Sequence, residues 1–566
     1  MTGDGRLLRA GVLIALAIAI VAPVTLGLWE TTRAAFGLLP AIGAERMSLA
    51  AWITLAGMPG LATSLRLTLV TGFGATLLSL LIALGAAAAV HARPRLAGRV
   101  LAPFLAAPHA ALAIGLAFVV APSGWIARAL SPWATGWQTP PALVTVHDPW
   151  GGALILGLMI KEVPFLLLVL LVALNQLPVA RHIAAGRAMG YGRAAVWIKV
   201  ILPQAYPLIR LPVFAVLAFS LSVVDMAVIL GPSNPPTLAV AITRWSFAPD
   251  TRMLLPAAAA ALLLGLIAGA GIAAWLLAER IVARAGLWWL RRGGRGRAGN
   301  TALTAATALA AGLLALGVLS IAALALWSVA WRWSFPSALP ESWSTAAWSR
   351  HGPAARNTLL TTLGIGVAAT LAALVLAVAW LEGEDRAHRA RAGWAELLVY
   401  LPLLVPQVAF LYGLNVAFLR SGLTGALPAV IWAHTLFVFP YVMIALTGPW
   451  RRLDRRILAT AAALGAGATR RLVTVKLPLL TGPLLTAAAI GFAVSVAQYL
   501  PTLFIGAGRV ATLTTEAVAL SSGADRRISG LYGLLQAALP WAVFATAFLL
   551  PIWLWRNRRD LRGGGP

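Results

Sequence analysis

The sequence predicts an all-α polytopic membrane protein, with about twelve transmembrane helices arranged as two parallel repeats of six. Its composition, its long apolar stretches and an internal repeat support this prediction. Of the 566 residues, 60% are hydrophobic and 11% are charged, whereas a soluble domain carries about 25% charged residues. So little polar surface argues against a soluble enzyme, a secreted disulfide scaffold and a disordered chain.

Twelve stretches are long and apolar enough to cross a hydrocarbon core, which takes about 20 residues as a helix. The first follows Arg6 and Arg9 and lacks a small-residue cleavage site, so we expect a retained anchor helix and not a cleaved signal peptide. The predicted spans are about 8–29, 64–90, 99–120, 151–174, 205–230, 255–278, 303–330, 357–381, 394–418, 427–448, 481–505 and 531–555.

The basic residues predict the orientation of the chain. The net charge is +27, and the basic residues separate apolar stretches instead of forming a stripe on a soluble surface. We therefore expect no nucleic-acid partner. With the N-terminus inside, the inner loops hold more than twice as many Lys and Arg residues as the outer loops, which predicts two cytoplasmic termini. Cysteine is absent, which excludes disulfides and thiolate metal sites.

An internal repeat divides the chain into two halves. Residues 182–203 (HIAAGRAMGYGRAAVWIKVILP) match residues 457–478 (ILATAAALGAGATRRLVTVKLP) at an offset of 275, and Thr237-Leu238 matches Thr512-Leu513 at the same offset. The Gly- and Arg-rich stretch 286–300 reads as a cytoplasmic linker. The predicted organisation is a first repeat over 1–285, this linker, and a second repeat over 301–566.

Each matching segment is expected to form a short helix, a glycine turn and a second helix. Alanines favour the first helix, and Gly190 and Gly465 supply the freedom to end it. Pro203 and Pro478 then mark the return to the membrane. A surface helix with small residues on one face suits docking into a cleft of a partner. The alternative is an interfacial helix without a partner.

The spacing from this glycine to the Leu-Pro pair resembles the EAA loop of binding-protein-dependent ABC importer permeases. The arrangement of both halves in one chain resembles the fused iron(III)- and thiamine-type permeases, and residues 108–132 and 161–171 resemble the thiamine subgroup most. The glutamate that names the loop is replaced by Ala184 and Ala459, with Arg181, Arg187, Arg455 or Arg456 as possible substitutes. The implied ATPase-coupling residues are Ala184, Gly186, Gly190, Pro203, Ala459, Ala461, Gly465 and Pro478.

This resemblance implies specific partners and a location. Two ABC ATPase subunits would bind beneath the loops, and a periplasmic binding protein would deliver a small solute to a permease in the bacterial inner membrane. The chain itself has no phosphate-binding Gly-x-x-x-x-Gly-Lys-Ser/Thr motif, no HExxH and no Gly-x-Ser-x-Gly. We therefore expect a non-enzyme without cofactor or metal, dependent on ATP hydrolysis by a separate subunit.

Polar residues inside spans mark the candidate solute pathway, because they are costly in lipid and tend to face a cavity or a partner. They are Lys161, Glu162, Asp225 and Gln498. The alternative role is an interhelical hydrogen bond or buried ion pair, which we expect for His109, His434, Gln407 and Asn415.

An acidic pathway would suit a cationic solute such as thiamine, although iron(III) and polyamines fit equally well. The alternative function is a secondary transporter driven by an ion gradient. A channel would need a polar stripe along several spans, and the sequence shows isolated polar residues only.

Overall fold

The computed structural model describes residues 3–92, 101, 104–295, 299–387, 393–523 and 525–554. Residues through 295 are called the first half and residues from 299 the second half. Positions 99–100 and 102–103 of the predicted third span, 296–298 of the predicted linker and 555 of the last predicted span lie outside the described residues. The described chain is mostly helical and has almost no sheet, which confirms the predicted all-α class.

The first half contains the following α-helices, π-turns (η1 and η3), 3-10 helices (η2 and η4) and short strands: α1 (Gly3–Leu16), η1 (Ala17–Val21), α2 (Ala22–Ala35), β1 (Leu38–Leu39), η2 (Pro40–Ile42), β2 (Ala44–Glu45), α3 (Ala50–Ala56), α4 (Leu61–Val90), α6 (His109–Val120), α7 (Trp125–Leu130), α8 (Gly152–Leu174), α9 (Val179–Ala188), α10 (Arg193–Val196), η3 (Trp197–Ile201), α11 (Leu202–Ser222), α12 (Asp225–Leu230), α13 (Leu238–Ser246), η4 (Thr251–Met253) and α14 (Leu254–Arg291). Strands β1 and β2 pair antiparallel. Helix α14 continues to Arg291, so the start of the predicted linker is helical.

The second half has the following elements: α15 (Asn300–Val329), β3 (Ala330–Arg332), β4 (Ser342–Trp343), α16 (Ala346–Arg386), α17 (Gly393–Leu404), α18 (Gln407–Arg420), α19 (Leu427–Arg452), α20 (Arg455–Ala463), α21 (Ala468–Arg471), η5 (Leu472–Lys476), α22 (Leu477–Leu479), α23 (Thr481–Ala497), α24 (Leu500–Gly506), α25 (Leu513–Ser521) and α26 (Arg526–Leu554). Strands β3 and β4 form a second antiparallel pair.

The described residues contain ten helices long and apolar enough to cross a membrane, or eleven if a bent pair counts as one span. Twelve spans were expected, and the difference has a local cause. The predicted span 394–418 is divided between α17 and α18, which are separated at Val405 and Pro406. Proline fixes its own backbone and disfavours helix in the residue before it, so one apolar stretch yields two short helices.

The packing of α4 explains why these helices suit a membrane. Its buried face carries small and hydroxyl side chains, including Thr68, Gly72 and Ala75, whereas Leu77 and Leu81 are 48% and 55% exposed. Small residues let helix backbones approach closely, and lipid solvates the outward leucines. The arrangement is the reverse of a soluble helix, in which the large apolar side chains face inward.

The first long helix of each half packs against the other half. Helix α2 packs along α18, and α15 packs along α6 and α4. Both crossings occur at a glycine: a Cβ on Gly413 would lie 2.0 Å from the Gly27 carbonyl oxygen, and one on Gly115 would lie 2.2 Å from that of Ser320. The backbones therefore touch at both places, and the exchange joins the two halves into one bundle.

A pair of equivalent hydrogen bonds shows the duplication in three dimensions. The amide of Leu238 donates to Thr68 Oγ1 on α4, and the amide of Leu513 donates to Thr362 Oγ1 on α16, each at 2.9 Å. Leu238 and Leu513 are the residues matched by the 275-residue offset. Helices α4 and α16 therefore occupy the same place in their respective halves.

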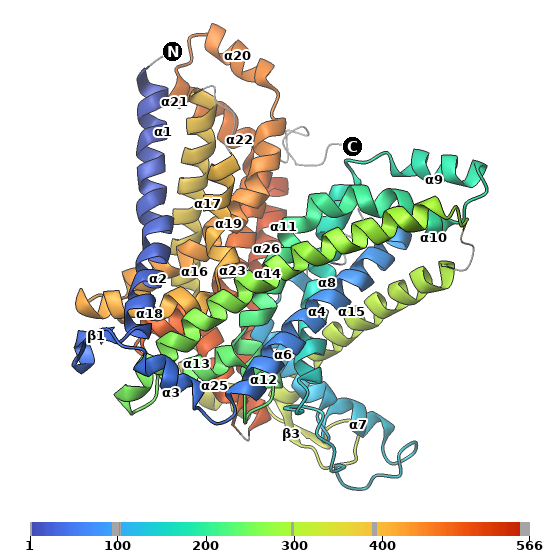
Figure 1. The fold of residues 1–566 in the computed structure, drawn as a ribbon, viewed down its shortest axis with the longest axis vertical. Helices are drawn as coiled ribbons and strands as arrows, with labels where there is room; N and C mark the ends of the chain where they lie inside the picture. The colour runs from blue at the N-terminus through green and yellow to red at the C-terminus, as the bar shows by residue number, and fades with distance from the viewer. Residues whose placement is uncertain are drawn as a thin grey trace.

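The bundle has two distinct ends. Helices α9 and α20 lie at the end where α1 begins, whereas α3, α7, α25 and β3 lie at the opposite end (Figure 1). The end with α9 and α20 is called the loop end. Because each half brings its matching segment to the same end, the two halves run in parallel.

Candidate functional site

The two matching segments, called the first repeat loop (182–203) and the second repeat loop (457–478), fold into the same hairpin. Helices α9 and α20 each end at a glycine with φ of +81°, Gly190 and Gly465. In the first loop the amide of Tyr191 donates to the Gly186 carbonyl at 2.9 Å, and Ala466 donates to Ala461 in the same way at 3.0 Å. This pairing is the Schellman C-cap, in which a left-handed residue, usually glycine, ends the helix.

The tips of both hairpins are open and apolar. Met189 and Leu464, each just before the turn glycine, are 60% and 83% exposed. Ala184, Gly190, Ala459 and Gly465 are exposed as well, and Ala461 is half-buried. Gly186 is buried, because a Cβ there would lie 2.2 Å from Val196 Cγ2.

A π-helical turn follows each hairpin at the same offset. The turns are η3 and η5, and Pro203 and Pro478 come two residues after them. Proline lacks an N–H and its ring clashes with the carbonyl four residues earlier, and a wider π-turn provides room for that ring. Both prolines lie inside helical segments, directly after the widened turns, and their role in marking the return to the membrane stays a prediction.

Beyond the prolines the two loops differ. Residues Arg193–Ser222 form one continuous span, whereas Ala468–Leu479 and Thr481–Ala497 are bent by 77° at Leu480. The first loop is therefore joined to its span by an unbroken helix, and the second is not.

Hydrogen bonds to backbone carbonyls attach the first loop to α4. Trp197 is fully buried, and its Nε1 donates to the Leu84 carbonyl at 3.0 Å. Arg193 donates to the Ala88 carbonyl. Both acceptors lie in the last turns of α4, so this helix end is where the hairpin meets the bundle.

The segment between the halves covers the first loop. The Gly192 amide donates to the Arg295 carbonyl at 3.1 Å, and Lys199 Nζ donates to the Gly294 carbonyl at 2.6 Å. The same ammonium lies 4.3 Å from the centre of the Trp289 ring. On the second loop, a Cβ added at Gly465 or Gly467 would meet nothing within 4 Å in the described chain.

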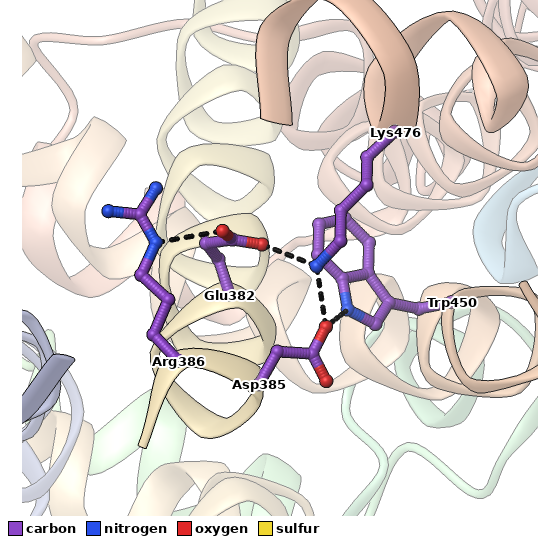
Figure 2. A network of polar contacts seen from close by, with 5 residues as sticks. All are labelled: Glu382, Asp385, Arg386, Trp450 and Lys476. Carbon is purple, nitrogen blue, oxygen red and sulfur yellow. Dashed lines mark hydrogen bonds and ion pairs between the residues drawn. The ribbon is translucent and has the colours of Figure 1, made fainter. Parts of the chain in front are cut away.

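A buried ionic cluster attaches the second loop to α16 (Figure 2). Lys476 Nζ lies 2.6 Å from Glu382 Oε2 and 2.6 Å from Asp385 Oδ2. Arg386 Nε donates to the other oxygen of Glu382 at 2.8 Å, and Trp450 Nε1 donates to Asp385 at 3.0 Å. The side chains of Lys476 and Glu382 are only 7% and 6% exposed.

Sequence reasoning missed this cluster. Lys476 reads as one of several basic loop residues, and Glu382 is 94 positions away along the chain. The signal that could have found it is the run Glu382-Gly383-Glu384-Asp385, because three acidic residues at the end of an apolar stretch are unusual in a chain with 17 in total.

The candidate pathway residues lie in the interior of the bundle. Lys161 and Glu162 of α8 are 5% and 6% exposed, and Asp225 and Gln498 are 8% and 6% exposed. Lys161 Nζ donates to the carbonyls of Phe104, Leu105 and Ala107 at 2.9, 3.2 and 2.6 Å. These carbonyls precede Pro108, where the chain breaks before α6, so the ammonium satisfies groups that a continuous helix would have paired.

Asp225 and Gln498 lie at equivalent breaks in the two halves. Asp225 begins α12 after a break at Val223 and Val224, and Gln498 ends α23 just before Tyr499 and α24. Asp225 interacts electrostatically with Lys161 and with Tyr499. Because Tyr499 belongs to the second half, and α12 also contacts α25 of that half, Asp225 lies near the boundary between the halves.

Glu162 also lies near that boundary, since it interacts electrostatically with Tyr441 of α19. The structure thus brings Lys161, Glu162 and Asp225 into one group. Gln498 is hydrogen-bonded elsewhere, because its Nε2 donates to the His434 carbonyl at 3.0 Å.

His434 holds the second half together from within. Its ring nitrogens lie 2.8 Å from Ser495 Oγ and 2.8 Å from Thr502 Oγ1, on α23 and α24. His109 packs its ring against Phe219 at 4.8 Å between ring centres. Asn415 Oδ1 accepts a hydrogen bond from Thr424 at 3.4 Å, and Gln407 begins α18. In the described part of the chain, no three His, Cys, Asp or Glu residues are grouped so that they could hold a metal ion.

Two parallel halves, paired hairpins at one end and polar groups at interior helix breaks define a multi-pass membrane permease. Comparison with known proteins identifies its family. The inner membrane ABC transporter permease protein YnjC of Escherichia coli is 34% identical over 520 residues, which cover 91% of this chain and 93% of that protein. The chain therefore belongs to the ABC transporter permeases, in the fused form with both halves in one chain.

Shorter matches agree with this assignment. PhnV of Salmonella typhimurium, named for a 2-aminoethylphosphonate transport system, is 32% identical over 158 residues, 27% of this chain and 59% of that protein. The molybdenum transport system permease protein ModB of Mycobacterium tuberculosis is 29% identical over 171 residues, 28% of this chain and 64% of that protein. No family model matches the chain.

These findings confirm the predicted family of ABC importer permeases and favour it over a transporter driven by an ion gradient. Permeases of this family work with ATPase subunits and binding proteins in general. The thiamine- or iron(III)-type assignment stays a prediction.

Proposed function

We propose that this chain is the membrane-spanning permease subunit of an ATP-driven importer in the bacterial inner membrane. The organisation is a first repeat over 1–285, a linker over 286–300 and a second repeat over 301–566. The loop end faces the cytoplasm, as the excess of basic residues in that set of loops predicts. ATP hydrolysis takes place on separate subunits.

The two repeat loops each receive one ATPase subunit. Their hairpins share a turn geometry, face the same end and expose an apolar residue at the tip, Met189 or Leu464. Two equal tips suit two copies of one partner. ATP-driven closure of the ATPases moves the hairpins together and biases the permease between inward- and outward-facing states.

A periplasmic binding protein delivers the solute to the opposite end, and the solute passes between the halves near Glu162 and Asp225. Two carboxyl groups against the single ammonium of Lys161 suit a small cationic solute of the thiamine type, because opposite charge offsets the cost of desolvation. Lys161 and Gln498 line this region from α8 and α23. The three N–H groups of Lys161 are used by backbone carbonyls, so Lys161 acts on the two carboxyl groups through its charge.

The paired hairpins at one end carry this proposal. The variants G190E and G465E should uncouple ATP hydrolysis from transport while the protein still inserts. At φ of +81° any side chain is strained, and the glutamate adds a charge at the tip of the hairpin. The test is uptake and ATPase activity of purified complexes in vesicles, with thiamine as the first solute tried. Serine at Leu479, on the same segment but beyond the hairpin, is the control. Normal coupled uptake by both glutamate variants would refute the role of the hairpins.

A further inference from the structure

The two halves need different means of carrying movement from the repeat loop to the interior. In the first half the helix from Arg193 to Ser222 is continuous over 30 residues, about 45 Å at 1.5 Å per residue. It ends one residue before the break that precedes Asp225. A push on the first hairpin therefore reaches that break along one continuous helix, which contains the π-turn η3 and the prolines Pro203, Pro207 and Pro212.

The second half lacks such a helix. The 77° bend at Leu480 separates the loop from α23, so a push on the second hairpin is not directed along α23. Lys476 lies four residues before the bend, and its carbonyl accepts the hydrogen bond of the Leu480 amide at 2.9 Å. The ionic cluster thus attaches the loop to α16 just where the helical route is interrupted.

Helix α16 reaches the interior by its own packing. It runs along α19 and α23, and Gly366 meets Phe492 of α23 so closely that a Cβ would lie 2.6 Å from Phe492 Cε2. Glu382 is 16 residues, or about 24 Å, from Gly366 along the helix. Phe492 is six residues before Gln498, where α23 breaks. A displacement of the α16 end therefore reaches the second interior break.

The burial and the pairing of the cluster suit it to keep the second repeat loop attached to α16 when the loop moves. Lys476 and Glu382 are almost fully buried, so water does not compete for the pair and salt screens it weakly. Each oxygen of Glu382 has a cationic partner, and the Lys476 ammonium also lies 4.8 Å from the centre of the Trp450 ring. A buried pair with its remaining groups satisfied fixes one geometry, and removing one member leaves a buried charge.

We propose that Lys476 is a positioning residue for the coupling of ATP hydrolysis to transport. Its ion pairs with Glu382 and Asp385 join the second repeat loop to α16, and α16 carries the movement in the second half. In the first half the continuous helix from Arg193 to Ser222 carries it. This inference rests on the proposed function, in which ATPases act on both loops.

The test measures movement of α16 in the complex purified with its ATPase subunits. The permease has no native cysteine, so Val172→Cys on α8 and Val375→Cys on α16, 57% and 68% exposed, accept spin labels selectively on this chain. The distance between the labels is measured without nucleotide and after trapping with ATP and vanadate. The test variant is K476M/E382Q, which removes one charge of each sign and so keeps the net charge of the cluster unchanged.

A matched control removes an equivalent pair that does not hold the loop. Arg451 and Glu384 lie 3.5 Å apart beside the cluster, but Arg451 belongs to α19 and is 51% exposed. We expect wild type and R451M/E384Q to show the nucleotide-dependent distance change. In K476M/E382Q the shifted population should fall at least about tenfold, within the usual range of coupling between sites, while ATPase subunits remain bound. The single variant K476R keeps a positive charge beside Glu382, so it should retain part of the nucleotide-dependent distance change.

A distance change of wild-type size in K476M/E382Q would overturn the proposal. If that variant fails to assemble, D385N weakens the same joint at its more exposed edge, where Asp385 is 39% exposed. A full change in D385N would overturn the proposal equally. Failure of the wild-type chain to retain ATPase subunits would instead refute the proposed function.

Discussion

The two repeat loops share a hairpin and differ in nearly everything that holds it. The first is packed, with Gly186 against Val196, a buried Trp197 and the Arg295 backbone laid over it. The second has no buried residue in α20 or α21 and is held by the ionic cluster at Lys476. Duplication has therefore preserved the shape of the tip and left its attachment free to vary.

The difference indicates which features the shared task requires. The turn glycine, the apolar tip and the π-turn before a proline occur twice, so a partner that treats both loops alike would depend on them. The attachment needs only to resist movement, and hydrogen bonds to backbone carbonyls achieve this in the first loop, as ion pairs do in the second. Substitutions at equivalent positions can test each part of this comparison.

The largest difference is expected between the two attachments. K476M leaves Glu382 buried beside only Arg386, and breaking a buried pair costs about 3–5 kcal/mol. W197F removes one neutral hydrogen bond to Leu84, worth about 0.5–1.5 kcal/mol, and leaves a small cavity beside the smaller ring, which adds about 1 kcal/mol. The midpoint of thermal unfolding in detergent should fall clearly in K476M and less in W197F. Equal shifts would show that the two anchors do not differ in kind.

The second largest difference is expected in the packing within the two hairpins. G186V forces methyl groups into Val196, and overpacking costs about 1–3 kcal/mol. A461V, at the matching position on α20, costs only the loss of helix propensity, at most about 0.7 kcal/mol. Trypsin should cleave the first hairpin of G186V faster than wild type and should treat A461V as wild type. Equal sensitivity of both variants would contradict the difference in packing.

The segment between the halves should detach from the first loop when its contacts with Lys199 are removed. K199M removes a charged donor to the Gly294 carbonyl and the contact with Trp289, together worth about 2 kcal/mol. Cleavage by trypsin after Arg291 and Arg295 should accelerate several-fold. The matched variant T474M, at the equivalent exposed position of the second loop, should leave that rate unchanged. An unchanged rate in K199M would mean that these contacts do not hold the segment.

The smallest difference is expected where the halves are alike. T68V and T362V each remove the acceptor of one buried amide, that of Leu238 or Leu513. Each should cost about 1 kcal/mol and lower the unfolding midpoint equally. A clear inequality would show that α4 and α16 are not equivalent at this level.

Much of this architecture follows from the sequence, and the exceptions have physical reasons. The turns at Gly190 and Gly465 are local, so a repeated glycine at fixed spacing predicts them. The bend at Leu480 and the break at Pro406 interrupt stretches that are apolar throughout. Hydropathy predicts that such a stretch lies in the membrane, but it does not predict where the helix axis changes direction. The pairing of Lys476 with Glu382 depends on two helices meeting, which no spacing along the chain specifies.

The interior site was partly predictable for the same reason. Lys161, Glu162 and Asp225 are conspicuous because charge is rare inside apolar stretches. Their partners are not, since the carbonyls of Phe104, Leu105 and Ala107 exist at every position and become acceptors only where the helix stops. Tyr499 approaches Asp225 from the other half, which only the assembled bundle reveals.

The most direct test of the account is the accessibility of the hairpin tips. In a chain without cysteine, Met189→Cys and Leu464→Cys are single labelling sites. A membrane-impermeant maleimide should modify both only in inside-out vesicles, and bound ATPase subunits should protect them. Modification of either tip from the exterior of intact cells would contradict the account.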